Sequence, residues 1–248
     1  MVAGTLQLQA RGIQDVYLTK DPEINVFQYQ YFRYVNFAND LYKIPLHDPA
    51  RFNSKTHVVI PKKGHLLSKL YLHLKLPKIV KTGGDYACWT DTIGYSIFNN
   101  PIELQIGGVI VDKLYPVGMD ILDELSTASN KLGHDRMIMK SDTWRSAIHN
   151  SDKEVDLMIP LNFWFTKHYS MALPLLSMTS QEIQINFSLA DFSKVINFDG
   201  LAAPPRVDIL DSNIFAEYIM LDDIVLDQFQ RQKHQYVISQ MIYNGDEN

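Results

Sequence analysis

The sequence predicts an all-β protein folded as an antiparallel sandwich. Three observations predict it: apolar and polar residues alternate along several segments, a Gly-Gly pair joins two of them, and helical patterns are short and few. Many short strands with little helix are typical of a sandwich or barrel rather than of alternating β–α units. The 248 residues suffice for one large all-β domain or two small ones.

Two segments show the strand pattern most clearly. Along 66–76, leucines alternate with bulkier or polar residues: Leu70, Leu72, Leu74 and Leu76 against Tyr71, His73 and Lys75. Along 181–189, apolar residues recur at every second position: Ile183, Ile185, Phe187 and Leu189. Such strands bury one face and leave the other in water, as antiparallel sandwiches require.

Segment 102–115 predicts a β-hairpin. Alternating apolar residues lead to Gly107 and Gly108, and a second apolar run follows at 109–111. The two glycines supply the positive φ angles that a two-residue turn needs. Weaker patterns predict further strands at 24–33, 56–60, 158–165 and 214–221.

Helices are expected in two places only. Met119, Leu122 and Leu125 form one apolar stripe over 118–125, which is enough for two turns. A second helix is expected within 227–240.

Two stretches interrupt the strand pattern. The polar segment 126–156 is longer than a simple connection, and we interpret it as an elaborated surface loop. Pro204 and Pro205 mark a break before a strand that should begin near Val207.

The composition is that of an ordinary globular protein, with 46% hydrophobic and 21% charged residues. The single cysteine, Cys88, cannot form an internal disulfide, so a reducing compartment is the simplest interpretation. No signal-peptide pattern begins the chain, and no apolar run reaches the ~18 residues of a membrane span. We therefore expect a soluble protein. A net charge of −5 argues against nucleic acid as the main partner.

Charge is unevenly distributed along the chain. Residues 49–84 hold eight lysines and arginines and no acidic residue, whereas 199–227 hold seven acidic residues against Arg206. The two stretches are either solvated strand faces that happen to differ in sign, or surfaces that pair within the domain or between subunits.

No residue is predicted to be catalytic, to bind a cofactor or to bind a metal. A metal pair on one strand face needs residues two apart, and none of the eight histidines has His, Asp or Glu two positions later. Nucleophile-elbow, phosphate-loop and dinucleotide motifs are missing, and 81–85 is interpreted as a turn. His57, His65 and His73 could form a pH-sensing cluster, but exposed strand-face residues are the favoured interpretation.

Three further features have structural interpretations. Cys88 is expected in the core. The aromatic run 163–165 is assigned to core or interface rather than to a sugar-binding platform. The glycosylation sequon at Asn186 lies in a predicted strand, so we expect it to be unused.

Four ordered stretches carry a resemblance to a known family. The first, 6–38, contains Gly12, Gln14, Asp15, Tyr17, Leu18 and Thr19, then Arg33, Asn36, Phe37 and Ala38. The second is 102–115 with the short helix after it. The third, 159–187, contains Pro160, Phe163, Trp164, Phe165, Ala172, Leu173, Pro174 and Leu175, and the fourth, 216–240, contains His234, Tyr236, Ile238 and Gln240.

In these stretches the chain resembles the major capsid proteins of nucleocytoplasmic large DNA viruses, a group that includes iridoviruses, asfarviruses and algal viruses. Two departures concern the branch of the family: an acidic-Glu-Arg sequence expected near Asp227 is missing, and 29–34 is unusually aromatic.

The resemblance implies an eight-stranded antiparallel jelly-roll sandwich, the first half of a double jelly roll, with long loop insertions and few short helices. The implied domains are 1–20, an N-terminal arm and first strand; 21–222, the first jelly roll; and 223–248, a linker and the start of a second jelly roll. We expect the chain to be part of a longer protein, and to be poorly soluble alone because the face that packs on its partner would be exposed.

The implied function is structural and not enzymatic, without cofactors. Three subunits would form a pseudo-hexagonal capsomer, and many capsomers an icosahedral shell, usually over an internal membrane. The expected partners are the chain itself, neighbouring capsomers and minor capsid proteins, with no sequence-specific nucleic-acid binding. The expected location is the virion, assembled in the host cytoplasm. The alternatives are a minor or vertex capsid protein of the same fold, and a jelly-roll sugar-binding module or metal-dependent enzyme.

Overall fold

The computed structural model describes residues 36–82, 84–126, 132–141, 143–199, 203–231 and 235–243. Contacts divide the chain into residues 1–36 and 37–248, and the elements below belong to the second unit. The predicted arm at 1–20 and the predicted strand at 24–33 lie outside the described residues.

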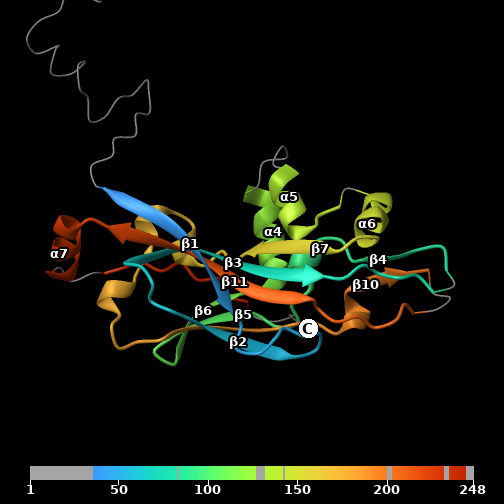
Figure 1. The fold of residues 1–248 in the computed structure, drawn as a ribbon, viewed down its shortest axis with the longest axis horizontal. Coiled ribbons are helices and arrows are strands. Elements are labelled where there is room, and N and C mark those ends of the chain that lie inside the picture. The colour runs from blue at the N-terminus through green and yellow to red at the C-terminus, as the bar shows by residue number, and fades with distance from the viewer. Residues whose placement is uncertain are drawn as a thin grey trace, which may run out of the picture. The chain divides into compact units, whose positions relative to one another are not determined.

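Two antiparallel sheets form the sandwich (Figure 1). The first has the order β1 (Phe37–Pro45), β11 (Asp211–Leu221), β3 (Leu66–Leu76) and β7 (Val155–Pro160), and β8 (Leu173–Pro174) also pairs with β3. The second has the order β2 (Lys55–Ile60), β9 (Ile183–Ser188), β5 (Ile102–Ile106) and β6 (Val109–Leu114). Apart from the β5–β6 hairpin, successive long strands alternate between the sheets, which is the eight-stranded jelly-roll arrangement. The predicted fold class is confirmed.

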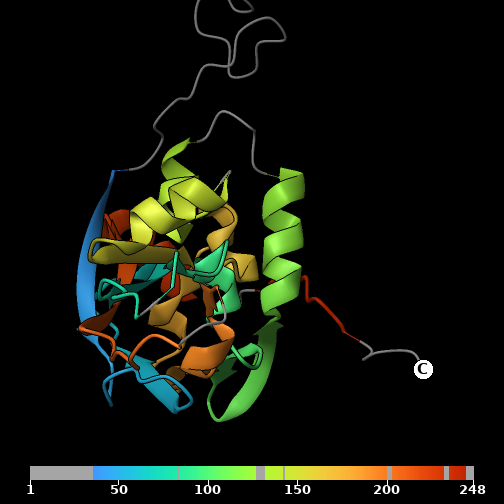
Figure 2. The ribbon, with the colours of Figure 1, turned by 90° about the vertical axis from the view of Figure 1, so that its right-hand side faces the viewer.

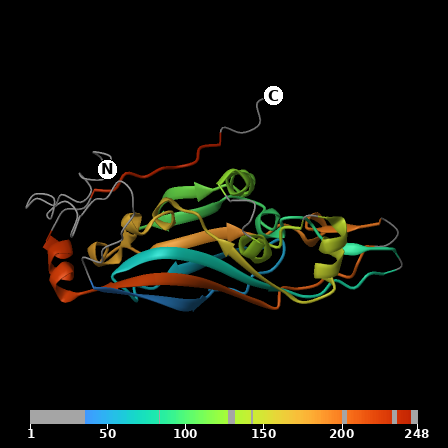
Figure 3. The same cartoon turned by 90° about the horizontal axis from the view of Figure 1, so that it is seen from above.

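Short elements complete the fold, and Figure 3 shows them around the sheets. β4 (Ala87–Trp89) and β10 (Ile196–Phe198) form a separate two-stranded sheet. The helices are α3 (Ile93–Ser96), α4 (Pro116–Ser126), α5 (Leu132–Ile138), α6 (Trp144–Ser151) and α7 (Asp223–Arg231), with 3-10 turns η1 (Trp164–Thr166), η2 (Tyr169–Met171), η3 (Leu175–Ser177) and η4 (Phe192–Lys194). Among the described residues, no helix is long and apolar enough to cross a membrane.

The core lies between the two sheets and follows the predicted alternation. All four predicted leucines of β3 are fully buried, whereas Tyr71, His73 and Lys75 lie on its outer face. β9 repeats the pattern with Ile183, Ile185 and Phe187 inside. Each such leucine or isoleucine contributes roughly 1.5–3 kcal/mol through burial, so these rows hold the sheets together.

The predicted hairpin is confirmed. Gly107 has φ +59° and Gly108 φ +81°, the left-handed values that a two-residue turn between twisted strands requires.

The strand predicted at 158–165 is wrong at its C-terminal end. β7 ends at Pro160, and the next residues turn, with the Phe163 amide donating to the Leu161 carbonyl at 2.9 Å. Phe163, Trp164 and Phe165 are all buried. Because a strand sends neighbouring side chains to opposite faces, three consecutive buried aromatic residues require this turn.

The prediction of a surface loop over 126–156 is also wrong. The described part contains α5 and α6, and it buries Ile138, Met139 and Ala147 against the sandwich. Helix α6 begins with a reciprocal cap in which Thr143 and Ser146 exchange hydrogen bonds. Ser146 stands where this motif usually has Glu or Gln, so the sequence lacks the usual signal for the start of a helix.

Both predicted helices exist with different details. In α4, Met119 is buried, but Leu122 and Leu125 are exposed, so the predicted stripe does not face the core. α7 begins at Asp223 and ends at Arg231, earlier than the predicted 227–240, and the described residues 235–240 are not helical.

The last strand begins later than the two prolines suggested. β11 starts at Asp211 rather than near Val207. The described residues 203–210 form no strand, and at their end the Leu210 amide donates to the Lys75 carbonyl at 2.9 Å.

Candidate functional site: the outer face of the first sheet

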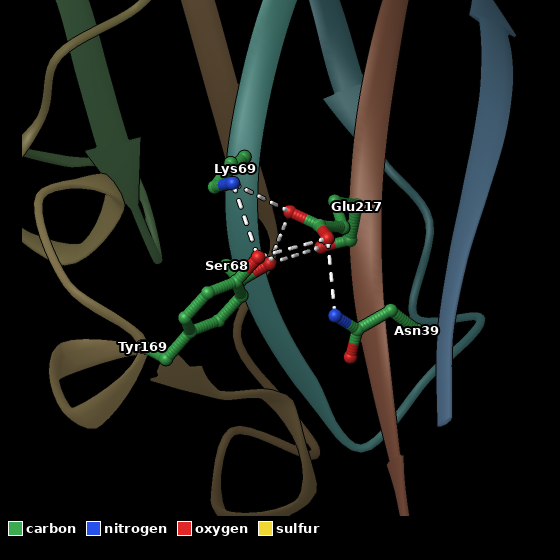
Figure 4. A network of polar contacts seen from close by, with 5 residues as sticks. All are labelled: Asn39, Ser68, Lys69, Tyr169 and Glu217. Carbon is green, nitrogen blue, oxygen red and sulfur yellow. Dashed lines mark hydrogen bonds and ion pairs between the residues drawn. The ribbon is translucent and has the colours of Figure 1, made fainter. Parts of the chain in front are cut away.

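The outer face of the first sheet carries a row of polar side chains across β1, β11 and β3. Glu217 lies at its centre and is only 16% exposed. Four other side chains surround its carboxylate: Asn39, Ser68, Lys69 and Tyr169 (Figure 4).

A β-bulge positions this cluster. The pairing of β11 with β3 shifts between Glu217 and Tyr218, so that Ser68 and Lys69 both lie opposite Glu217. In a regular strand the two would point to opposite faces, but a bulge lets neighbouring residues share one face. In the sequence, the bulge shows as a break in the two-residue spacing of the buried leucines, because Leu67 and Leu70 are three positions apart.

The contacts join three strands and the η2 turn. Ser68 Oγ donates to Glu217 Oε2 at 3.0 Å, and Asn39 Nδ2 donates to Oε1 at 3.2 Å. Tyr169 Oη donates to Oε1 at 3.4 Å. Lys69 Nζ lies 3.7 Å from Oε2 and 3.1 Å from Tyr169 Oη. The cluster therefore links β1, β11 and β3 through their side chains and gives this face a charged centre.

Electrostatics agree with this geometry. The hydrogen bond to Tyr169 and the charge of Glu217 hold the pKa of Lys69 above its usual value. The Lys69 ammonium also lies over the Tyr169 ring, 4.9 Å from its centroid. The lysine is therefore a fixed cation within the cluster.

Among the described residues, one ion pair within the domain confirms the predicted pairing of the basic and acidic stretches. Lys69 and Glu217 come from the two stretches and meet because β3 and β11 are neighbours. Lys75 pairs instead with Glu154 at 2.7 Å, and Lys43, outside the basic stretch, pairs with Asp211 at 3.3 Å. Pairing between subunits stays a prediction.

The three histidines of the basic stretch lie in different surroundings. His57 stacks on His47, with ring centroids 4.7 Å apart. His65 Nδ1 accepts from the Leu221 amide at 2.8 Å, and His73 Nε2 lies 3.1 Å from Asp156. The structure does not bring them together as a pH-sensing cluster.

A cavity of about 900 Å³ lies beside β4, β10 and α6. Cys88 and Trp89 line it, and both are buried, as predicted for Cys88. Burial raises the pKa of the Cys88 thiol and so disfavours the reactive thiolate. A second hollow, of about 580 Å³, lies over the second sheet and includes Asn186 of the sequon, which is in β9 as predicted.

Within the described ranges, no group of three or more His, Cys, Asp or Glu side chains could hold a metal ion. The aromatic run 163–165 is buried, which agrees with its assignment to the core. The residues of the outer-face cluster were not predicted as a site, and Lys69 and Glu217 stood out only as members of charged stretches.

Comparison with known sequences identifies the family. The sequence profile of the family described as "Major capsid protein N-terminus" matches residues 25–222. The chain belongs to this family.

Relatives of this capsid-family chain are longer than it is. The major capsid protein of Phaeocystis pouchetii virus is 27% identical over 282 residues, and that of Paramecium bursaria Chlorella virus 1 is 28% identical over 248. Each comparison covers 100% of this chain and 54% of the relative. The chain thus spans about half the length of the curated relatives it matches. The family consists of capsid proteins and not of enzymes, which confirms the prediction of a non-enzymatic protein.

Solved structures show the same fold. The PBCV-1 virus capsid protein aligns with a TM-score of 0.72 and 24% identity, over 87% of this chain and 50% of that one. The Faustovirus major capsid protein aligns with a TM-score of 0.64 and 11% identity, over 91% and 62%. These likenesses confirm the jelly roll.

Proposed function

We propose that this chain is the N-terminal jelly roll of a major capsid protein and that its work is to build a virus shell. The observation that carries the proposal is the family match over 25–222, which coincides with a complete eight-stranded jelly roll. The outer-face cluster agrees with a structural role, because its contacts link three strands of the first sheet through their side chains.

The finer proposal concerns the whole protein. Its domains are an arm and first strand at 1–20, the first jelly roll at 21–222, and a linker at 223–248 that leads into a second jelly roll. Three such proteins form a pseudo-hexagonal capsomer, and capsomers and minor capsid proteins form an icosahedral shell over an internal membrane. The shell is assembled in the host cytoplasm. The length of the relatives supports a second domain of similar size.

Expression of the gene's full reading frame tests the proposal. Sedimentation should show a trimer, and electron microscopy should show pseudo-hexagonal particles or arrays. A stable monomer that never forms arrays would contradict it and favour a minor capsid protein. A stoichiometric metal or binding to a glycan array would favour the enzyme or sugar-binding alternative.

A further inference from the structure

The cavity beside β4, β10 and α6 lies at the end of the sandwich opposite α7 (Figure 1). Figure 2 looks onto this end. Three connections between the long strands build the cavity: β4 follows β3, α6 precedes β7, and β10 precedes β11. Its volume of about 900 Å³ lies within the range of roughly 300–1,000 Å³ that is usual for small-molecule sites. The place suits a ligand, because segments that connect the elements of a rigid scaffold often carry binding sites.

Hydrogen bonds hold the walls of this cavity together. Ser151 Oγ of α6 accepts from the Trp89 amide of β4 at 2.9 Å. Asp91 Oδ1 accepts from the Ser141 amide at 2.9 Å, which ties the segment after β4 to the segment before α6. Because the walls are linked in this way, the cavity keeps its shape and a ligand spends little binding free energy on ordering it.

The most deeply buried residues of the cavity lining are apolar. Those less than one-tenth exposed are Cys88, Trp89, Ala147 and Ile196. Less buried aromatic and aliphatic side chains complete this part of the lining: Tyr86, Ile148 and Phe198. Side chains of this kind pack against the C–H groups of a bound molecule.

One buried polar group in the lining has no partner. The Trp89 side chain is fully buried, and among the described residues nothing accepts a hydrogen bond from its indole Nε1–H. Buried polar groups in folded proteins are nearly always paired, so this donor calls for an explanation. The indole can only donate, and a ligand that pairs with it therefore offers an acceptor such as a hydroxyl or ether oxygen.

The charged groups of the lining are acidic. Asp85 and Asp91 are exposed there, and none of the described residues that line the cavity is Lys, Arg or His. Neutral polar side chains are added by Ser141, Thr143 and Asn197. Carboxylates accept hydrogen bonds from hydroxyl groups and repel anions. The lining therefore suits a neutral molecule that is rich in hydroxyl groups, and it disfavours phosphates, sulfates and acidic sugars.

We propose that this cavity binds a neutral saccharide. Its hydroxyl groups donate to Asp85 and Asp91, one of its oxygens accepts from the Trp89 indole, and its C–H face packs on the apolar lining. A simple organic cation would satisfy the carboxylates but leave the Trp89 donor unpaired, and an apolar ligand would satisfy neither. The inference does not depend on the proposed function.

Protection of Cys88 from alkylation tests the proposal, because this thiol lines the cavity. The protein made from the full reading frame is titrated with glucose, galactose, mannose, xylose and N-acetylglucosamine, and with glucuronic acid as the anionic probe. Calorimetry gives the affinity and stoichiometry, and mass spectrometry of the peptide that contains Cys88 gives the alkylation rate. In urea-unfolded protein, the sugars should leave that rate unchanged.

We expect at least one neutral sugar to bind one to one and, at about ten times its Kd, to slow Cys88 alkylation about tenfold, because only the empty site reacts. Glucuronic acid should not protect the thiol. Asp91→Asn keeps an oxygen for the Ser141 amide but loses the charge, and Trp89→Phe keeps an aromatic ring without the donor. Each should weaken binding at least about threefold, the effect of losing one hydrogen bond. Asp227→Asn, on α7 at the other end, is the matched control and should bind like the original protein.

Circular dichroism shows whether each variant is folded, and Asp91→Asn decides the matter if Trp89→Phe is not. No protection by any neutral sugar, equal protection by glucuronic acid, or unchanged binding in Asp91→Asn would overturn the inference.

Assembly is measured in the same preparation. Particles that bind no sugar would remove only this inference, whereas a sugar-binding protein that never assembles would keep it and contradict the proposed function. Sugar binding by a protein that does assemble is a second property of a shell subunit, and not the separate sugar-binding module named above as an alternative.

Discussion

Glu217→Ala tests whether the outer-face cluster stabilises the sandwich. The substitution removes the carboxylate that accepts from Ser68, a residue only 2% exposed. It also removes the partner of Asn39, Lys69 and Tyr169, which are more exposed. A buried hydrogen bond to a charged group contributes about 1.5–3 kcal/mol, but Ser68 keeps the Glu217 backbone carbonyl as a second acceptor at 3.2 Å. The exposed contacts each add less than about 1 kcal/mol. We therefore expect a loss of about 2 kcal/mol.

The assay is urea unfolding of the 248-residue chain, at a protein concentration low enough to avoid aggregation, with thermal unfolding beside it. A loss of about 2 kcal/mol corresponds to a fall in Tm of roughly 4–8 °C for a domain of this size. Glu154→Ala is the matched control, because it also deprives a β3 lysine, Lys75, of its partner, but its side chain is 55% exposed. We expect that control to lose less than about 0.5 kcal/mol.

A double-mutant cycle separates the free energy of the Ser68–Glu217 contact from the other effects of removing Glu217. Ser68→Ala and Glu217→Ala together should lose at least about 0.5 kcal/mol less than the sum of the two single losses. If Glu217→Ala shifted the midpoint no more than Glu154→Ala does, the cluster would be an ordinary surface ion pair and the reasoning would be wrong.

Three further outcomes are expected. Leu72→Ala, at a fully buried position, should lose about 2–5 kcal/mol in urea unfolding, whereas Leu125→Ala should lose almost nothing in the 248-residue chain; equal losses would contradict the assigned core. Burial raises the pKa of Asp112, so its ionised form opposes folding; Asp112→Asn should be more stable than the original chain at pH 7, and the gain should disappear as pH falls below the usual carboxyl range. Because 51–81 is basic and 199–227 mostly acidic, capsomer association should weaken with salt, and light scattering unchanged between low and high salt would rule out pairing between subunits.

The parts of the fold that were predictable depend on local chemistry. Alternating leucines gave β3 its buried face, and Gly107 and Gly108 gave the hairpin its turn, because each pattern has one physical solution. The strand order is not local, since β1 pairs with β11 across most of the chain, and it was predicted only through the family resemblance.

The candidate site was harder to predict for a related reason. A bulge brings Ser68 and Lys69 to the same carboxylate, and the only trace in the sequence is one break in the leucine spacing. Likewise, α4 has an apolar stripe of ordinary appearance. That it faces solvent depends on Asp123 and its contact with α5, which no periodicity reveals.

The strand order has a consequence for the order of events during synthesis. In the first sheet, β1 pairs with β11, and about 165 residues separate them. At roughly 5–20 residues per second, a ribosome needs about 8–33 s to make that interval, and β1 must wait through it without its partner. β3 waits similarly for β7 and β11, whereas β5 and β6 can pair as soon as the Gly107–Gly108 turn emerges. The nascent chain therefore exposes unpaired, leucine-rich strands for many seconds, and its yield in a cell should depend on chaperones that bind such segments.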